Sequence, residues 1–248
     1  MNKTTHFTIQ KTGNMLMLLL ILSFVSFPAY TQTIQGNGNV ITEVREVSYF
    51  NGISVSGSIN LFITMGDKFH VEVESDENII KHIDTETHGD VLVIGLEGKG
   101  ISIINPKEMN VYVTLPELLS LTASGATDVT VNNTIEQPTL RIKASGASDM
   151  TLPVNVEYLE MNLSGASDAR INGYAKATNA TLNGASDVKK SDLVTDKLEV
   201  NLSGSSDLRI KVTENITGKL SGASDLVYEG NPTTDLKTSG ASSVKKKK

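Results

Sequence analysis

Apolar and polar residues alternate along much of the chain after residue 118. Every second residue is apolar in stretches such as LEMNL at 159–163 and LRIKV at 208–212. A period of two places these side chains on one face of a β-strand. No stretch in this region keeps the helical period of 3.6 residues over three turns. The pattern therefore predicts an all-β fold in which each strand buries one face.

Seven small polar pentapeptides separate these strands. Three read SGASD, at 145–149, 164–168 and 221–225; the others are SGATD at 124–128, NGASD at 183–187, SGSSD at 203–207 and SGASS at 239–243. Their glycines are 18–21 residues apart. A nearly constant period of this length is typical of a solenoid, in which each repeat stacks on the next.

Two architectures fit a strand, a pentapeptide corner and a second short strand in every repeat. One is an antiparallel β meander or sandwich, and the other is a parallel β-helix with coils of about 18–21 residues. Tight hairpins prefer two-residue loops, whereas this corner takes five residues. Identical small residues also stack well on their own copies. We therefore favour the parallel β-helix over residues 119–244, and we expect its corner glycines to be intolerant of side chains.

Residues 32–118 read as a less regular β section that continues into the solenoid. A Ser-Gly-Ser corner occurs at 56–58, and Gly66-Asp67 is typical of a hairpin turn. DENIIKHI at 76–83 is the one stretch that suggests a helical turn, with Asp76 as its N-cap. Strand patterns resume in GDVLVIGLEG and MNVYVTLPEL.

Residues 1–31 have the layout of a secretory signal peptide. Lys3 and Lys11 precede an apolar run of 13 residues at 15–27, and the small residues Ala29 and Thr31 follow it. The run is short for a membrane-spanning helix, which needs about 20 residues, so cleavage before Gln32 is favoured over a permanent anchor. We expect an exported mature chain without a transmembrane span.

Charge and composition narrow the function. Removing residues 1–31 deletes two lysines and no acid, so the net charge moves from −6 to about −8. Nucleic-acid binding depends on Lys and Arg neutralising phosphates, which makes it a poor fit here. The chain has no Cys, so disulfides and thiol chemistry are excluded. The Lys245–Lys248 end is predicted to be a solvated basic tail that discourages end-to-end stacking.

The last residue of six pentapeptides is an aspartate. If the coils stack, these residues form one column of neighbouring carboxylates: Asp128, Asp149, Asp168, Asp187, Asp207 and Asp225. We favour a structural role, in which each Asp accepts hydrogen bonds from hydroxyl and N–H groups of its own corner. The alternative is a ladder of bound cations. The final corner reads SGASS, so a carboxylate is not required at every corner.

Nothing in the sequence assigns a catalytic residue, a cofactor or a metal site. His70, His82 and His88 lack a metal-binding spacing. Glycoside hydrolysis needs two carboxylates in unlike environments, whereas a repeated column makes its environments alike. A carbohydrate-active β-helix enzyme is therefore the least favoured function.

The pattern at 50–61, DENIIKHI followed by GDVLVI, and the chain of SGASD corners together resemble the head GIN domain family. The resemblance extends over about 48–244. Members are exported proteins of Gram-negative bacteria described as auto-transporter adhesins, and the resemblance implies a right-handed β-helix-like fold and an adhesin role.

We therefore expect an exported, non-enzymatic, adhesin-like protein that presents an extended polar surface in the periplasm, on the outer-membrane surface or outside the cell. Its partner would be a surface glycan or a protein, and the pattern is compatible with a homo-oligomer. The alternative is a structural envelope protein without a specific ligand.

Overall fold

The computed structural model describes residues 32–98, 100–188 and 191–247, and the predicted signal peptide lies outside them. Most of the described chain from residue 119 is in strands, as the period-two pattern predicts. These strands are β10 (Ser120–Gly125), β11 (Asp128–Val131), β12 (Ile135–Gly146), β13 (Asp149–Leu163), β14 (Asp168–Leu182), β15 (Asp187–Val188), β16 (Leu193–Leu202), β17 (Asp207–Leu220), β18 (Asp225–Glu229), β19 (Thr233–Thr238) and β20 (Ser243–Lys246).

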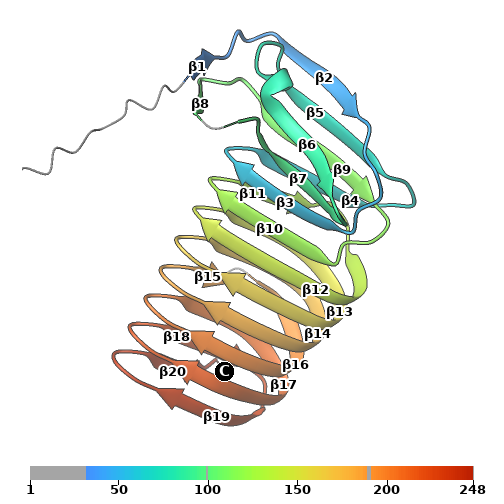
Figure 1. The fold of residues 1–248 in the computed structure, drawn as a ribbon. Helices are drawn as coiled ribbons and strands as arrows, with labels where there is room; N and C mark the ends of the chain where they lie inside the picture. The colour runs from blue at the N-terminus through green and yellow to red at the C-terminus, as the bar shows by residue number, and fades with distance from the viewer. Residues whose placement is uncertain (1–31, 99, 189–190, 248) are drawn as a thin grey trace, which may run out of the picture. The chain divides into compact units, whose positions relative to one another are not determined.

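All pairings among β10–β20 are parallel, and Figure 1 shows the strands of successive coils lying side by side. A long strand such as β13 leaves one corner, bends, and runs on to the next corner as a single element. The segment before each corner forms the pre-corner sheet, and the segment after it forms the post-corner sheet. The predicted parallel β-helix is confirmed, and the antiparallel meander is excluded.

The core lies between the two sheets and is built from columns of side chains in register. One column runs through Leu121, Ile142, Met161, Ala180 and Val200, all of them fully buried. Parallel stacking places each residue about 4.8 Å from its equivalent in the next coil, so the apolar alternation of one coil is reinforced by its neighbours.

Residues 32–118 form the N-terminal section. Its described elements are β1 (Gln32–Gln35), β2 (Val40–Arg45), β3 (Gly52–Gly57), β4 (Asn60–Met65), β5 (His70–Asp76), the 3₁₀ helix η1 (Ile80–His82), β6 (Ile83–His88), β7 (Val91–Leu96), β8 (Ile101–Ile104) and β9 (Met109–Leu115). Strands β3 and β4 pair in parallel with β10 and β11, so both sheets continue into this section.

Antiparallel strands end both sheets in the N-terminal section. In the post-corner sheet the order is β4, β9, β5 and β2, with β5 antiparallel to both of its neighbours. In the pre-corner sheet β3 pairs with β7, and β6 pairs with β7 in the antiparallel sense. The hairpin predicted at Gly66-Asp67 is therefore wrong, because β9 lies between β4 and β5. A Gly-Asp turn motif predicts that the chain reverses direction, but it does not determine whether the strands before and after it pair with each other.

The predicted helical turn exists as η1, but Asp76 is not its N-cap. Ile79 occupies that position without a side-chain cap. The Asp76 carboxylate is fully buried and accepts hydrogen bonds from the backbone N–H groups of Gly38 and Lys107, the latter at 2.7 Å. Burial by itself would raise the pKa of Asp76, but these bonds and those from the N–H groups of Glu108 and Asp76 hold it below its usual value. Asp76 thereby joins the segment at Gly38 to the segment at Lys107, which are far apart in the sequence.

The last described coil replaces apolar residues with polar ones. Thr234 and Thr238 of β19 stand in register with Ile216 and Leu220, and Lys246 of β20 stands in register with Tyr228. The three polar residues are exposed. Polar side chains on an end repeat and charges on an edge strand keep such edges from pairing further.

Candidate functional site

The pentapeptide corner is a structural element. Gly165 has a φ of +79°, and a Cβ atom there would lie 2.5 Å from the carbonyl oxygen of Gly146 in the preceding coil. That carbonyl accepts a 2.8 Å hydrogen bond from the N–H of Ala166. The corner therefore needs glycine for two reasons, its backbone conformation and the close approach of the next coil. This geometry agrees with the predicted intolerance of the corner glycines.

The fourth residue of each corner closes the turn from inside. The Ser167 side chain is fully buried, and its hydroxyl donates a hydrogen bond of 2.9 Å to the carbonyl oxygen of Ser164. The same bond recurs at the equivalent residues Thr127, Ser148, Ser186, Ser206, Ser224 and Ser242. The sequence suggested that these hydroxyls bond the Asp side chains, but they bond backbone carbonyls. Successive residues of a strand point to opposite faces, so the inward hydroxyl and the outward carboxylate are separated.

The structure brings the six predicted aspartates together. The register pairs each with the next, giving one continuous column of Asp128, Asp149, Asp168, Asp187, Asp207 and Asp225. Asn60 and Asn110 continue the column at one end, and Ser243 continues it at the other. The two asparagines were missed because neither belongs to a full pentapeptide. Asn60 could have been found from its spacing, since it follows Gly57 by three residues as Asp128 follows Gly125.

The column has partners within neighbouring coils. Asp225 accepts a 2.5 Å hydrogen bond from the Ser243 hydroxyl, and Lys245 lies 3.7 Å from its carboxylate. Asn60 donates a 3.0 Å hydrogen bond to Asn110. In the described part of the chain, no group of three or more His, Asp or Glu side chains is arranged to hold a metal ion. The structural role of the aspartates stays a prediction, with the cation ladder as its alternative.

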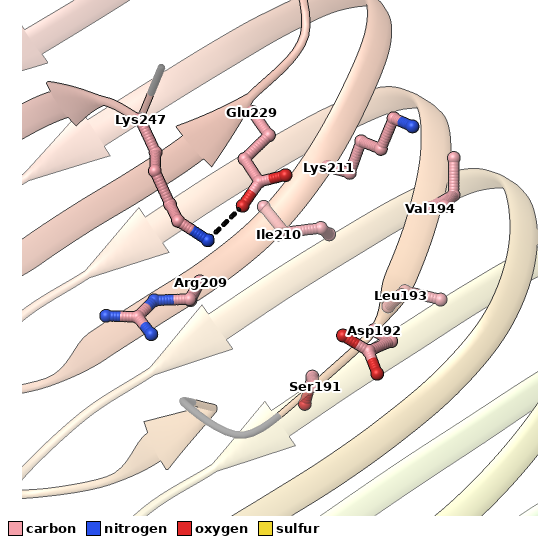
Figure 2. Close-up of a pocket in the computed structure, with 9 residues that line it drawn as sticks. All are labelled: Ser191, Asp192, Leu193, Val194, Arg209, Ile210, Lys211, Glu229 and Lys247. Atoms are coloured by element: carbon pink, nitrogen blue, oxygen red, sulfur yellow. Dashed lines mark hydrogen bonds and ion pairs between the residues drawn. The ribbon is translucent and has the colours of Figure 1, made fainter.

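A first hollow, of about 330 Å³, is lined by residues 191–194 and by residues of the coils that follow them, among them Arg209, Lys211, Glu229 and Lys247. Ser191 contacts the preceding coil, because its hydroxyl accepts a 2.9 Å hydrogen bond from the N–H of Ile171. Lys247 lies 2.6 Å from Glu229. Figure 2 shows this contact with Arg209 and Lys211 nearby, their charged ends extending in different directions. The bond from Lys247, with the charges of Lys247, Lys211 and Arg209, lowers the pKa of Glu229. The lining of this hollow therefore carries both acidic and basic side chains, and they do not converge on one position.

A second hollow, of about 290 Å³, lies over the aspartate column. Its lining includes Asp149, Asp168 and Asp187 together with Thr151 and Arg170. The aspartates occupy equivalent register positions. Equivalent positions give similar surroundings, whereas acid–base catalysis by two carboxylates requires environments that separate their pKa values.

A third hollow, of about 370 Å³, lies at the bend opposite the corners. Its lining residues come from three successive coils: Thr134, Glu136, Pro153, Val154, Asn155, Asn172, Gly173 and Tyr174. The Tyr174 hydroxyl donates a 2.5 Å hydrogen bond to Asp196, which also accepts a 2.7 Å bond from Thr213. The bond to Asp196, with some desolvation and the negative charges of Asp196, Glu157 and Glu214, raises the pKa of Tyr174 to about 12. The Tyr174 hydroxyl therefore keeps its proton at neutral pH and stays hydrogen-bonded to Asp196.

The outward side of the pre-corner sheet is a broad polar surface. We call two register columns on it the polar columns. They contain Arg141, Glu160, Asn179, Glu199, Thr217 and Asp235 in one, and Lys143, Asn162, Thr181, Asn201, Lys219 and Lys237 in the other. All are exposed or half-buried. Contacts along the surface include Arg141–Glu160 at 3.4 Å and Asn179–Glu199 at 3.3 Å, so its side chains are partly held in place.

The family model described as "Putative auto-transporter adhesin, head GIN domain" matches residues 49–232. The chain belongs to the head GIN domain family. The family expected from the corner motifs is thereby confirmed, and the match includes both the N-terminal section and the repeated coils. A comparison with curated proteins gave no match. In the described residues, no helix has the length and apolar character needed to cross a membrane.

Solved structures of bacterial proteins share the fold of this head GIN domain protein. A putative adhesin from Bacteroides fragilis NCTC 9343 is 24% identical, with a TM-score of 0.80, over 86% of this chain and 100% of that one. A putative adhesin from Parabacteroides distasonis ATCC 8503 is 19% identical, with a TM-score of 0.75, over 87% and 100%. A putative lipid binding protein from the same organism is 21% identical, with a TM-score of 0.74, over 88% and 100%.

Proposed function

We propose that this head GIN domain protein is an exported, non-enzymatic adhesin whose polar columns make contact with a surface glycan or protein. The polar columns are the observation that carries the proposal. Repeated coils place equivalent polar residues at a fixed spacing, and such a surface can make many weak contacts at once. The family description and the predicted signal peptide support the same function.

A non-enzymatic role is supported by the similarity of the aspartate environments. Export would place the mature chain, beginning near Gln32, in the periplasm, on the outer-membrane surface or outside the cell. N-terminal sequencing of the protein from an envelope fraction tests this part, and an intact Met1 would contradict it.

An adherence assay tests the adhesin role. Residues 32–248 coupled to beads are passed over surfaces coated with purified glycans or with extracellular matrix proteins, and the retained beads are counted. We expect retention on at least one surface, and we expect the combined change Lys143→Ala, Asn162→Ala, Thr181→Ala and Asn201→Ala to abolish it.

The matched control changes Thr130→Ala and Thr151→Ala, which pair in register on the outward side of the post-corner sheet. This control should adhere like the wild type. Failure of the wild type to adhere to any coated surface would contradict the adhesin role and favour a structural envelope protein without a specific ligand.

A further inference from the structure

One residue that lines the third hollow, Gly173, cannot carry a side chain. Gly173 has a φ of +114°, and a Cβ atom there would lie 2.1 Å from the carbonyl oxygen of Val154. Glycine is therefore required at this bend, and its backbone lines the hollow together with Pro153 and Tyr174. The Tyr174 residue remains 37% exposed. Tyr174, Pro153 and the backbone of Gly173 thus border the same space.

Hydrogen bonds within the protein fix the Tyr174 side chain before any ligand binds. Tyr174 belongs to one coil, Asp196 to the next, and Thr213 to the one after that, and two hydrogen bonds join the three. A side chain fixed in its bound orientation loses less conformational entropy on binding.

Polar side chains also line the third hollow. The Asn172 side-chain oxygen accepts a 3.0 Å hydrogen bond from the N–H of Asp192, which orients the amide and leaves its NH₂ group as a donor. Asn155 and Glu136 are exposed and add further donors and acceptors. A sugar ring presents an apolar C–H face and a rim of hydroxyls, so it matches an aromatic wall surrounded by amides and a carboxylate.

The charge of the residues that line the third hollow favours neutral over acidic sugars. The described lining contains Glu136 and neither Lys nor Arg. The nearby cations are engaged elsewhere, with Lys176 lying 3.1 Å from Glu157 and Lys197 lying 3.8 Å from Glu214. A carboxylated or sulfated sugar would bring a negative charge beside Glu136, and the described lining contains no cation to offset it.

We propose that the hollow formed by Pro153, Gly173 and Tyr174, with Asn155 and Asn172 at its rim, binds one unit of a neutral glycan. The inference rests on the proposed adhesin function and adds to the polar columns a second contact, at the bend opposite the corners, with its ligand class. Its volume lies near the lower end of the range for ligand pockets, about 300–1,000 Å³, which suits a mono- or disaccharide unit. A single shallow site binds weakly, so adhesion would depend on many copies of the protein on one surface.

Purified residues 32–248 should be screened on an array of neutral gluco-, manno- and galacto-oligosaccharides together with sialyllactose and oligogalacturonate. The strongest oligosaccharide is then titrated by NMR. We expect neutral oligosaccharides to bind with millimolar affinity, and Tyr174→Ala to weaken that binding by about tenfold. Tyr158→Ala is the matched control, because Tyr158 is 36% exposed and lies outside the described lining. It should bind like the wild type.

Asn155→Ala provides a second variant at an exposed rim position, in case Tyr174→Ala lowers the melting temperature. It should weaken neutral glycan binding and leave melting unchanged. Binding of acidic glycans alone, binding of none, or unchanged affinity in both Tyr174→Ala and Asn155→Ala would overturn the inference.

The adherence assay separates this inference from the proposed function. If the wild type and Tyr174→Ala adhere equally well, the protein is an adhesin that does not use this hollow. If the wild type does not adhere but binds neutral oligosaccharides through Tyr174, the glycan site stands and the adhesin role fails.

Discussion

The N-terminal section and the repeated coils bury similar aliphatic cores but satisfy their backbones differently. Each inner coil from β12 to β17 has a parallel neighbour on both sides, and its corner lies on a copy of itself. The N-terminal section has strands at the edge of each sheet, and there β2 and β6 run antiparallel to their neighbours. It also depends on an individual buried carboxylate, Asp76, which has no equivalent among the corner residues. An inner coil satisfies its backbone by pairing with equivalent coils on both sides. The N-terminal section lacks such a neighbour on one side, so it requires contacts that the coils do not use.

The corner glycines show the same difference at one register position. Gly57 and Gly165 both have positive φ, at +101° and +79°. A Cβ atom at Gly57 would meet no atom within 4 Å, whereas one at Gly165 would strike the backbone of Gly146. The first glycine is needed for its conformation, and the second for its conformation and its stacking.

The largest expected effect separates these two requirements. Gly165→Ala should destabilise the protein by about 3 kcal/mol, because backbone strain and a backbone clash combine. Gly57→Ala should cost about 1–2 kcal/mol through the conformation alone. Thermal melting of the two variants measures the difference. Equal losses would show that coil stacking is looser at Gly165 than the structure indicates.

The next effect concerns the buried carboxylate of the N-terminal section. Asp76→Asn should destabilise by about 2 kcal/mol at pH 7, because a charged acceptor of several N–H groups is lost. Because the pKa of Asp76 is lowered on folding from 3.8, its contribution is present above that pH and is lost as the pH falls through the folded value.

The stabilities of the wild type and Asp76→Asn should therefore converge below pH 3.8. Denaturant unfolding at several pH values measures this, with Asp67→Asn as the control at an exposed aspartate. A constant gap between the two curves down to low pH would exclude an ionised Asp76 as the cause.

A smaller effect is expected inside one corner of the coils. Ser206→Ala removes a buried hydroxyl that donates a 3.0 Å bond to the Ser203 carbonyl, and it should cost about 1 kcal/mol. Ser205→Ala changes the exposed neighbour to the residue that most other corners carry, and it should be neutral. If both variants melt alike, the inward hydroxyl does not stabilise the corner.

The smallest effect is expected in the aspartate column. Asp149→Asn should change stability by no more than about 0.5 kcal/mol, because it removes an exposed carboxylate lying between Asp128 and Asp168. Calcium and chelator should leave the melting temperature of the wild type unchanged. A rise with calcium that Asp149→Asn reduces would instead establish the cation ladder.

The repeated coils could be predicted from the sequence in detail, whereas the third hollow could not. Period-two alternation and a constant corner spacing are local properties, and each coil repeats them, so the inward residues and the aspartate column followed directly. Tyr174 departs from the repeat, since Asn155 and Val194 occupy the same register position in the adjacent coils. Reasoning from the repeat passes over a residue that occurs once.

The sequence by itself determined the strand class, the corner, the period and the family, because these depend on neighbours along the chain and on identical copies. The tertiary structure decided three further features: that β9 separates β4 from β5, that Asp76 binds loops on both sides of it, and that Asp196 anchors Tyr174. Each of these joins residues far apart in sequence whose surroundings are unlike. No local pattern encodes such a contact, because it forms only when the stacking register brings the two segments together.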